Sequence, residues 1–318
     1  MFIESFQVVG AAVAQILILG AVGFILVKKN ILGECGLDNL SRLTLDITLP
    51  IMIFTQLVRD FSFSIFPNWW IFPLISMAVT VLGLSVGFIL SLFIKGEQHK
   101  MQFASLVGFQ NSGYLPLPLL AALLPVGELK VMFIYLFLFL LGFNLIMFSV
   151  GIYLLTFLKG KKFDWFSLFS APVLAVLLSF FLIFFKLNKF IPDLVYQPLK
   201  WLGDCTLPLA MLVVGGSLAK VELKHVDIKA MSLMCLAKLL ILPAIGFLFV
   251  WKARMPFLVS LLIFIQLAMP PAANLSVIVR SYKKEDLLIS QGTFFGHILS
   301  IITLPVLLSL YFAFIMLK

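Results

Sequence analysis

Long runs of apolar residues separated by short polar segments dominate this sequence. Each run has roughly 20 residues or more, the length that an α-helix needs to cross the hydrocarbon core of a bilayer. No linker, low-complexity stretch or charge block separates the runs, so the pattern predicts an all-α membrane protein without a soluble domain between its helices. About ten spans are expected, at residues 5–27, 38–58, 69–94, 101–124, 129–158, 167–186, 194–218, 228–250, 256–279 and 287–317.

The composition supports this interpretation. Hydrophobic residues make up 62% of the chain and charged residues only 12%, whereas a soluble domain has about 25% charged residues. The net charge of +9 comes from basic residues in the short loops, where they set topology rather than bind nucleic acid. Cys35, Cys205 and Cys235 lack the spacing of a metal site. A soluble protein is therefore excluded.

The distribution of Lys and Arg predicts how the helices are oriented. Loops after odd-numbered spans carry more of these residues than loops after even-numbered spans, and they include Lys28, Lys29 and the basic segment 159–162. Basic loops tend to stay in the cytoplasm. We therefore expect both termini outside, in a multi-pass protein of the cell inner membrane or plasma membrane.

A short internal repeat divides the chain into two halves. Asp46-Ile-Thr-Leu-Pro50 in the second span recurs as Asp204-Cys-Thr-Leu-Pro208 in the seventh, at an offset of 208 − 50 = 158 residues. Five is an odd number of helices, so the second half enters the membrane from the opposite face. We predict two inverted repeats, residues 1–160 and 161–318, an arrangement found in many secondary transporters.

Prolines and amides interrupt the fourth helix of each half. The fourth span contains Gln110-Asn-Ser-Gly-Tyr-Leu-Pro-Leu-Pro118, and the ninth contains Gln266-Leu-Ala-Met-Pro-Pro-Ala-Ala-Asn274. Each proline lacks a backbone donor and frees a carbonyl one turn earlier, which is tolerated at membrane depth only where protein, water or a solute satisfies it. Either break alone fits a packed proline kink. The matched pair predicts a transport site near the midplane.

The chemistry of these breaks favours a small organic anion, most simply a carboxylate. The second half of each broken helix begins with unpaired N–H groups and a positive dipole end, and the amides add neutral donors. The alternative is a sodium-coupled symporter of the bile-acid type, which would use the freed carbonyls as cation ligands, but no acidic residue lies at either break. The predicted substrate-binding residues are Gln110, Asn111, Ser112, Gly113, Pro118, Pro270, Pro271 and Asn274.

Three ionisable residues inside the spans are candidates for ion coupling. Asp46 and Asp204 belong to the repeat, and each fits either a coupling role or a structural hydrogen bond. Lys238 lies near the middle of the eighth span. It could be a substrate counter-ion, a partner for one of the aspartates, or a side chain that snorkels to the interface.

Other polar residues and motifs restrict the remaining function classes. His297 could relay protons or pack as a hydrogen-bonded core residue, whereas Asn144 and Gln291 fit hydrogen bonding between helices better than ligand binding. The chain carries no metal-ligand, nucleophile or P-loop motif. We therefore predict no catalytic residue, no cofactor, no metal and no enzyme activity. A channel stays open as an alternative, and saturable flux would distinguish a carrier from it.

The two broken segments resemble those of the auxin efflux carrier family, which includes plant PIN-type carriers and many bacterial organic-acid carriers. The most specific part is Ala268-Met-Pro-Pro-Ala-Ala-Asn274, which Tyr282, Asp286 and Leu304-Pro305 follow. The segment from Asn111 to Pro118 is similar to the crossover in the family's fourth helix.

This resemblance implies a fold and a site. The family is similar in fold to the bile-acid/sodium symporters, with ten helices in which broken helices 4 and 9 cross. The resemblance implies that Asn111, Pro118 and Asn274 line the substrate site. Because dimers are common among inverted-repeat carriers, a homodimer in the lipid bilayer is the assembly to test.

Overall fold

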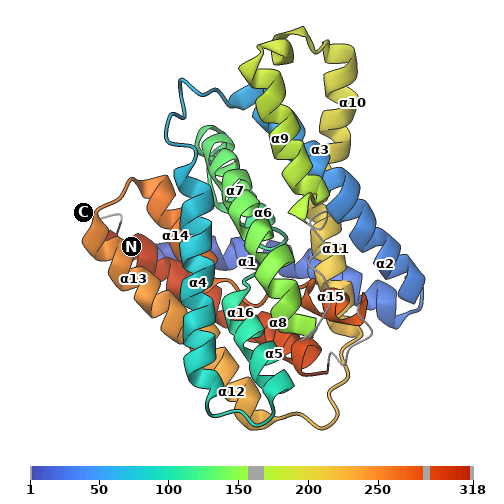
Figure 1. The fold of residues 1–318 in the computed structure, drawn as a ribbon, viewed down its shortest axis with the longest axis vertical. Coiled ribbons are helices and arrows are strands. Elements are labelled where there is room, and N and C mark those ends of the chain that lie inside the picture. The colour runs from blue at the N-terminus through green and yellow to red at the C-terminus, as the bar shows by residue number, and fades with distance from the viewer. Residues whose placement is uncertain (1, 157–167, 282–286, 316–318) are drawn as a thin grey trace.

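The computed structural model describes residues 2–156, 168–281 and 287–315, and these residues form helices and connecting loops. In Figure 1, α3, α9 and α10 lie at one end of the long axis and α5 and α12 at the other, with α1 and α16 across the middle. The elements are α1 (Phe2–Lys28), α2 (Glu34–Arg42), η1 (Leu43–Thr48), α3 (Leu49–Asp60), α4 (Ile71–Ser91), α5 (Glu97–Gly108), α6 (Pro116–Leu123), α7 (Val126–Ile146), η2 (Met147–Gly151), α8 (Ile152–Thr156), α9 (Ala171–Phe184), η4 (Leu187–Phe190), α10 (Asp193–Asp204), α11 (Thr206–Ala219), α12 (Ile228–Leu236), η5 (Ala237–Ile241), α13 (Leu242–Ala253), α14 (Phe257–Ala268), α15 (Leu275–Ser281) and α16 (Leu287–Ile315).

Helices occupy all the spans that the sequence predicts. In seven of the ten expected spans the helical stretch is long and apolar enough to cross a membrane, whereas the other three contain shorter helices, namely α5 with α6, α9, and α14 with α15. An all-α protein with several membrane-spanning helices is therefore confirmed. The predicted boundary between two halves, at residues 160 and 161, lies outside the described residues. Seven stretches of the described chain are long and apolar enough to cross a membrane: Phe2–Lys28, Cys35–Asp60, Ile71–Ser91, Val126–Leu155, Asp193–Ala219, Ile228–Ala253 and Leu287–Phe314.

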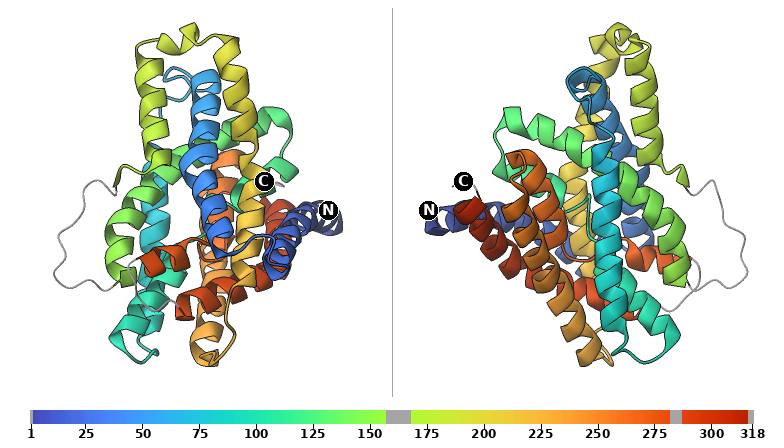
Figure 2. Two further views of the ribbon diagram at one scale, coloured as in Figure 1. Left: turned by 90° about the vertical axis from the view of Figure 1, so that its right-hand side faces the viewer. Right: turned by 60° about the vertical axis from the view of Figure 1, so that its left-hand side comes forward.

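The connecting loops gather at the two ends of the molecule. In both views of Figure 2 the hairpin of α9 and α10 projects at one end, together with the loop that follows α3. The loops that follow α4 and α11 lie at the opposite end. The loops after expected spans 2 and 6 therefore lie at one end of the molecule, and the loops after expected spans 3 and 7 lie at the other.

Prolines widen two of the long helices without ending them. The elements η1 and η5 are π-helical segments, and each is followed two residues later by a proline. Because proline cannot donate to the carbonyl four residues earlier, a wider turn accommodates the lost hydrogen bond. Asp46 lies in η1 and Lys238 in η5. Two of the three candidate coupling residues therefore occupy widened turns, which are frequent at functional sites.

Glycines allow close contacts between helices. A Cβ atom at Gly215 in α11 would lie 1.8 Å from the carbonyl oxygen of Gly20 in α1, where no side chain can fit. Between α4 and α5, a Cβ at Gly83 would lie 3.0 Å from the Cα of Gly108. Such small residues let backbones of membrane helices approach and gain dispersion energy. The second contact lies where α5 ends, and it helps to fix the position of the break.

Candidate functional site

Both predicted interruptions are present in the structure. Residues 109–115 separate α5 from α6, and residues 269–274 separate α14 from α15. Pro116 is the first residue of α6 and Pro118 lies in the same first turn, where N–H groups have no partner within the helix and the loss of one costs little. The prolines therefore allow a new helix to begin after the break.

Backbone hydrogen bonds join the two interruptions to each other. Gln110 and Pro271 form an antiparallel bridge, and beside it the Asn111 N–H donates to the Pro270 carbonyl at 2.8 Å. Backbone groups released by one broken helix are thus satisfied by the other, as a low-dielectric environment requires. The fourth and ninth expected helices meet at their breaks.

Side chains from elsewhere satisfy two further carbonyls at the first break. Lys238 Nζ donates to the Val107 carbonyl at 3.0 Å, and Gln266 Nε2 donates to the Ser112 carbonyl at 3.2 Å. Lys238 is only 1% exposed, so it does not snorkel. Neither aspartate of the repeat pairs with it in the described part of the chain. The contact of Lys238 with the end of α5 is not predicted by the sequence.

A cavity of about 100 Å³ lies at the crossing. Pro118, Pro270 and Pro271 shape the crossing but do not line this cavity. Three further polar lining residues, Tyr114, Asn144 and Ser170, were not among the predicted site residues. The predicted residues that do line it are Asp46, Gln110, Asn111, Ser112, Gly113 and Asn274.

The structure separates two amides that the sequence treats alike. Asn144, expected to join helices, lies in the cavity wall beside the predicted ligand residues. Gln291 does join segments, because its Nε2 donates to the carbonyls of Glu222 and Lys224, each at 2.9 Å. Both are single amides in apolar helices, so the sequence had no signal to separate them. Ser170, just before α9, likewise gave no signal of its own.

Polar atoms of the cavity residues are buried without a hydrogen-bond partner among the described residues. They are Gln110 Nε2, the Tyr114 hydroxyl and Ser170 Oγ. A buried unpaired donor costs about 1–3 kcal/mol, so a protein seldom keeps several together without a ligand to bind. All three can donate to an oxygen atom of a solute. The cavity is therefore equipped to bind a hydrogen-bond acceptor.

The two aspartates of the repeat lie in different surroundings. Asp46 lines the crossing cavity and also an open groove between α3 and α9. Asp204 is exposed and forms an ion pair with Lys200, with 2.6 Å between the nitrogen and the carboxylate oxygen. Only Asp46 is placed to interact with a solute at the crossing.

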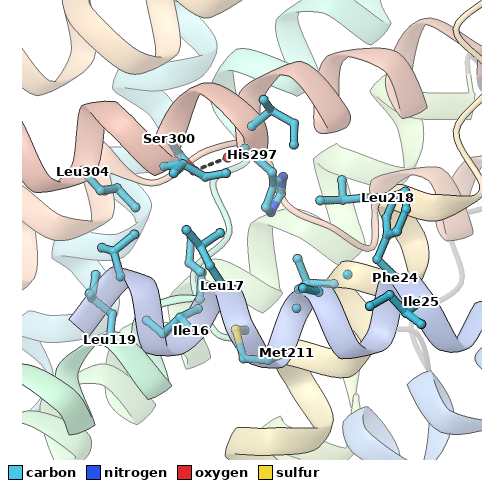
Figure 3. A pocket seen from close by; sticks show the side chains of 18 residues that line it. Ile16, Leu17, Phe24, Ile25, Leu119, Met211, Leu218, His297, Ser300 and Leu304 are labelled. Atoms are coloured by element: carbon cyan, nitrogen blue, oxygen red, sulfur yellow. Dashed lines mark hydrogen bonds between the residues drawn. The ribbon is translucent and has the colours of Figure 1, made fainter. Parts of the chain in front are cut away.

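A second cavity of about 340 Å³ lies on the other side of this site. Its wall is almost entirely apolar and comes from α1, α11 and α16, with Leu115 just before α6 and Leu119 within it. Figure 3 shows the His297 ring pointing from α16 into this cavity, toward α1. His297 Nε2 also lies 3.1 Å from Asn111 Nδ2, so the two cavities share a polar wall.

The fold and site define a class: a multi-pass helical membrane protein whose two interrupted helices meet around a polar cavity. The chain matches the family described as "Membrane transport protein" over residues 8–165 and 155–308. It therefore belongs to this family, the auxin efflux carrier family that the two broken segments resemble, and is a membrane transporter.

Two relatives carry informative names. An "Uncharacterized transporter" of Methanothermobacter thermautotrophicus is 26% identical over 302 residues, which cover 92% of this chain and 95% of that protein. "Protein PIN-LIKES 6" of Arabidopsis thaliana is 30% identical over 114 residues, which cover 35% of this chain and 26% of that protein. The match to the plant protein thus spans about a quarter of its length.

Proposed function

We propose that this transporter is a secondary carrier for a small organic anion, most simply a carboxylate, that binds in the crossing cavity. The observation that carries the proposal is the set of unpaired donors on Gln110, Tyr114 and Ser170 around a volume of about 100 Å³. A carboxylate accepts several hydrogen bonds, and bonds to an ionised acceptor are stronger than those between neutral groups. Such a ligand would satisfy donors that have no partner among the described residues.

Asp46 suggests how transport could be coupled to protons. It is the acidic residue in the wall of a cavity that would bind a second carboxylate. Two carboxylates at close range repel, and a shared proton removes the repulsion. Anion binding and proton binding at this cavity would then be linked. Asp204, paired with Lys200 on the exposed surface, would have a structural role.

We propose ten crossings, built as two inverted halves at residues 1–160 and 161–318 with both termini outside. The helices at all ten expected spans support this arrangement, as do the alternate loop ends in Figure 2 and the repeat at Asp46 and Asp204. Carriers of this architecture work by rocking one group of helices against another around a fixed site.

The contacts at the breaks favour an anion over sodium. Two carbonyls near the fourth-helix break, those of Val107 and Ser112, already accept hydrogen bonds from Lys238 and Gln266. A sodium-coupled mechanism would need other ligands.

A thermal-shift screen of the purified protein tests the proposal. Acetate, lactate, malate, benzoate and indole-3-acetate would each be added in sodium and in potassium buffers, over a pH series. A carboxylate that binds the folded state raises stability by RT ln(1 + [L]/Kd). We expect at least one to do so without sodium. If none shifts the unfolding temperature, or if every shift requires sodium, the proposed function is wrong.

Asn274→Ala then tests the site. Loss of a hydrogen bond to a charged group costs about 1.5–3 kcal/mol, so affinity should fall by roughly one to two orders of magnitude. Asn188→Ala is the control, because Asn188 Nδ2 donates to the Val58 carbonyl at 2.9 Å and does not line the cavity. Equal affinity of the Asn274 variant and the parent would remove this residue from the site.

A further inference from the structure

The hydrogen bonds of His297 fix its tautomer. Its Nδ1 lies 2.8 Å from the Thr293 carbonyl oxygen. A carbonyl can only accept, so Nδ1 carries the proton, and in the neutral ring Nε2 is then an acceptor. The partner of Nε2 is Asn111 Nδ2 at 3.1 Å, which donates. His297 and Asn111 are 5% and 2% exposed, so water has little access to compete for these bonds.

The same contacts fix the orientation of the Asn111 amide. Asn111 Oδ1 accepts from the Leu115 N–H at 3.3 Å, while Nδ2 donates to His297. If the amide were flipped, Oδ1 would face the Nε2 lone pair and Nδ2 would face the Leu115 N–H. Both contacts would be repulsive. The Leu115 N–H and His297 therefore select the same orientation of the amide, and His297 holds its Nδ2 end across a separation of 186 residues in the chain.

One hydrogen of Asn111 Nδ2 is left over in this arrangement. Asn111 lines the crossing cavity, and the described residues provide Nδ2 with no acceptor besides His297. On its other side the His297 ring faces the apolar cavity. Among the described residues that line this cavity, His297 is the only titratable one, and the hydroxyl of Ser300 donates to the His297 carbonyl rather than to Nε2.

We propose that His297 is a positioning residue for the carrier site: it holds the Asn111 amide so that its free N–H is available to the anion. This inference rests on the proposed function and adds a residue from α16, a helix outside the crossing itself. The role requires an acceptor at the position of Nε2 and does not require an imidazole. A purely structural histidine would lack that specific requirement.

Two conservative variants separate these roles. In His297→Gln the side-chain oxygen can take the place of Nε2 and accept from Asn111. In His297→Asn the shorter amide can still donate to Thr293 but cannot reach Asn111. Ser300→Ala is the control, since Ser300 lines the same apolar cavity and donates to the His297 carbonyl at 2.7 Å. The probe is the carboxylate that gives the largest shift in the panel above.

We expect His297→Asn to weaken binding of that carboxylate by about threefold to tenfold, the range of one neutral hydrogen bond. His297→Gln and Ser300→Ala should bind within about twofold of the parent. The positioning role is refuted if His297→Asn binds as the parent does while Asn111→Ala does not. If Asn111→Ala also binds as the parent does, Asn111 is not part of the proposed carrier site.

Nitrogen NMR of protein with ¹⁵N-labelled histidine gives a readout that needs no ligand. The chain has three histidines, and loss of one signal set in His297→Gln assigns His297. We expect a ring protonated at Nδ1 whose Nε2 resonance shifts in Asn111→Ala but not in Asn188→Ala. A ring protonated at Nε2, or an Nε2 signal that ignores Asn111→Ala, would overturn the inference even if the carrier function stands.

Discussion

Replacement of Gln110 by leucine should change stability and binding in opposite directions. The Gln110 side chain is 1% exposed, and its Nε2 is among the buried atoms without a partner in the described chain. Gln291 is equally buried at 1% but donates to two carbonyls, each at 2.9 Å. The same substitution therefore removes an Nε2 that is unpaired among the described residues at Gln110, and an Nε2 with two acceptors at Gln291.

The magnitudes follow from these contacts. An unpaired buried polar group costs about 1–3 kcal/mol, so Gln110→Leu should stabilise the ligand-free protein by up to that amount. It would also remove a donor to the anion, worth about 1.5–3 kcal/mol, and weaken binding by roughly one to two orders of magnitude. Gln291→Leu leaves two carbonyls without their donor and should destabilise by about 1–3 kcal/mol, with affinity unchanged. A gain in stability with a loss of function is typical of binding sites.

Thermal unfolding in detergent, with and without the carboxylate that binds best, measures both the stability of the ligand-free protein and its affinity for the carboxylate. The substitution is the same at both positions, so both variants undergo the same change in side-chain volume. The reasoning is refuted if Gln110→Leu lowers the unfolding temperature as Gln291→Leu does. It is also refuted if Gln110→Leu binds the carboxylate as tightly as the parent.

Three further predictions concern packing, coupling and topology. Gly215→Ala should destabilise by about 1–3 kcal/mol in thermal unfolding because its Cβ would overlap the α1 backbone. The control Gly10→Ala in α1, where a Cβ would have no atom within 4 Å, should be neutral or stabilising by up to about 1 kcal/mol. Equal stability of the two variants would contradict the packing of α1 on α11. Asp46→Asn should abolish the pH dependence of carboxylate uptake. Asp204→Asn loses only an exposed ion pair, so uptake should stay pH-dependent and the free energy of unfolding should fall by less than about 1 kcal/mol. If a well-folded Asp46→Asn protein still shows pH-dependent uptake, coupling through Asp46 is excluded. A cysteine added after Lys318 should react with an impermeant reagent in intact cells, and labelling only after permeabilisation would reverse the proposed orientation.

Much of the site could be predicted from the chain, because prolines and amides act locally. Residues 109–115 and 269–274 separate helices where the proline pairs stand, and six of the predicted site and coupling residues line one cavity. Pro118, Pro270 and Pro271, which are also predicted to bind the substrate, lie at the crossing without lining this cavity, and their contact with a substrate stays a prediction. Tyr114, Asn144 and Ser170 could not be selected, since isolated polar residues occur in many helices of this composition.

The sequence alone determined the helices and their interruptions, because the length of an apolar run and the missing N–H of a proline are properties of neighbouring residues. Only the tertiary structure decided which groups satisfy the interrupted backbone: Lys238 on Val107, Gln266 on Ser112 and one break on the other. It also separated Asp46 from Asp204, which the repeat had made equivalent. Such contacts join residues far apart in the chain. They depend on how helices pack, and the local pattern of apolar and polar positions does not specify that packing.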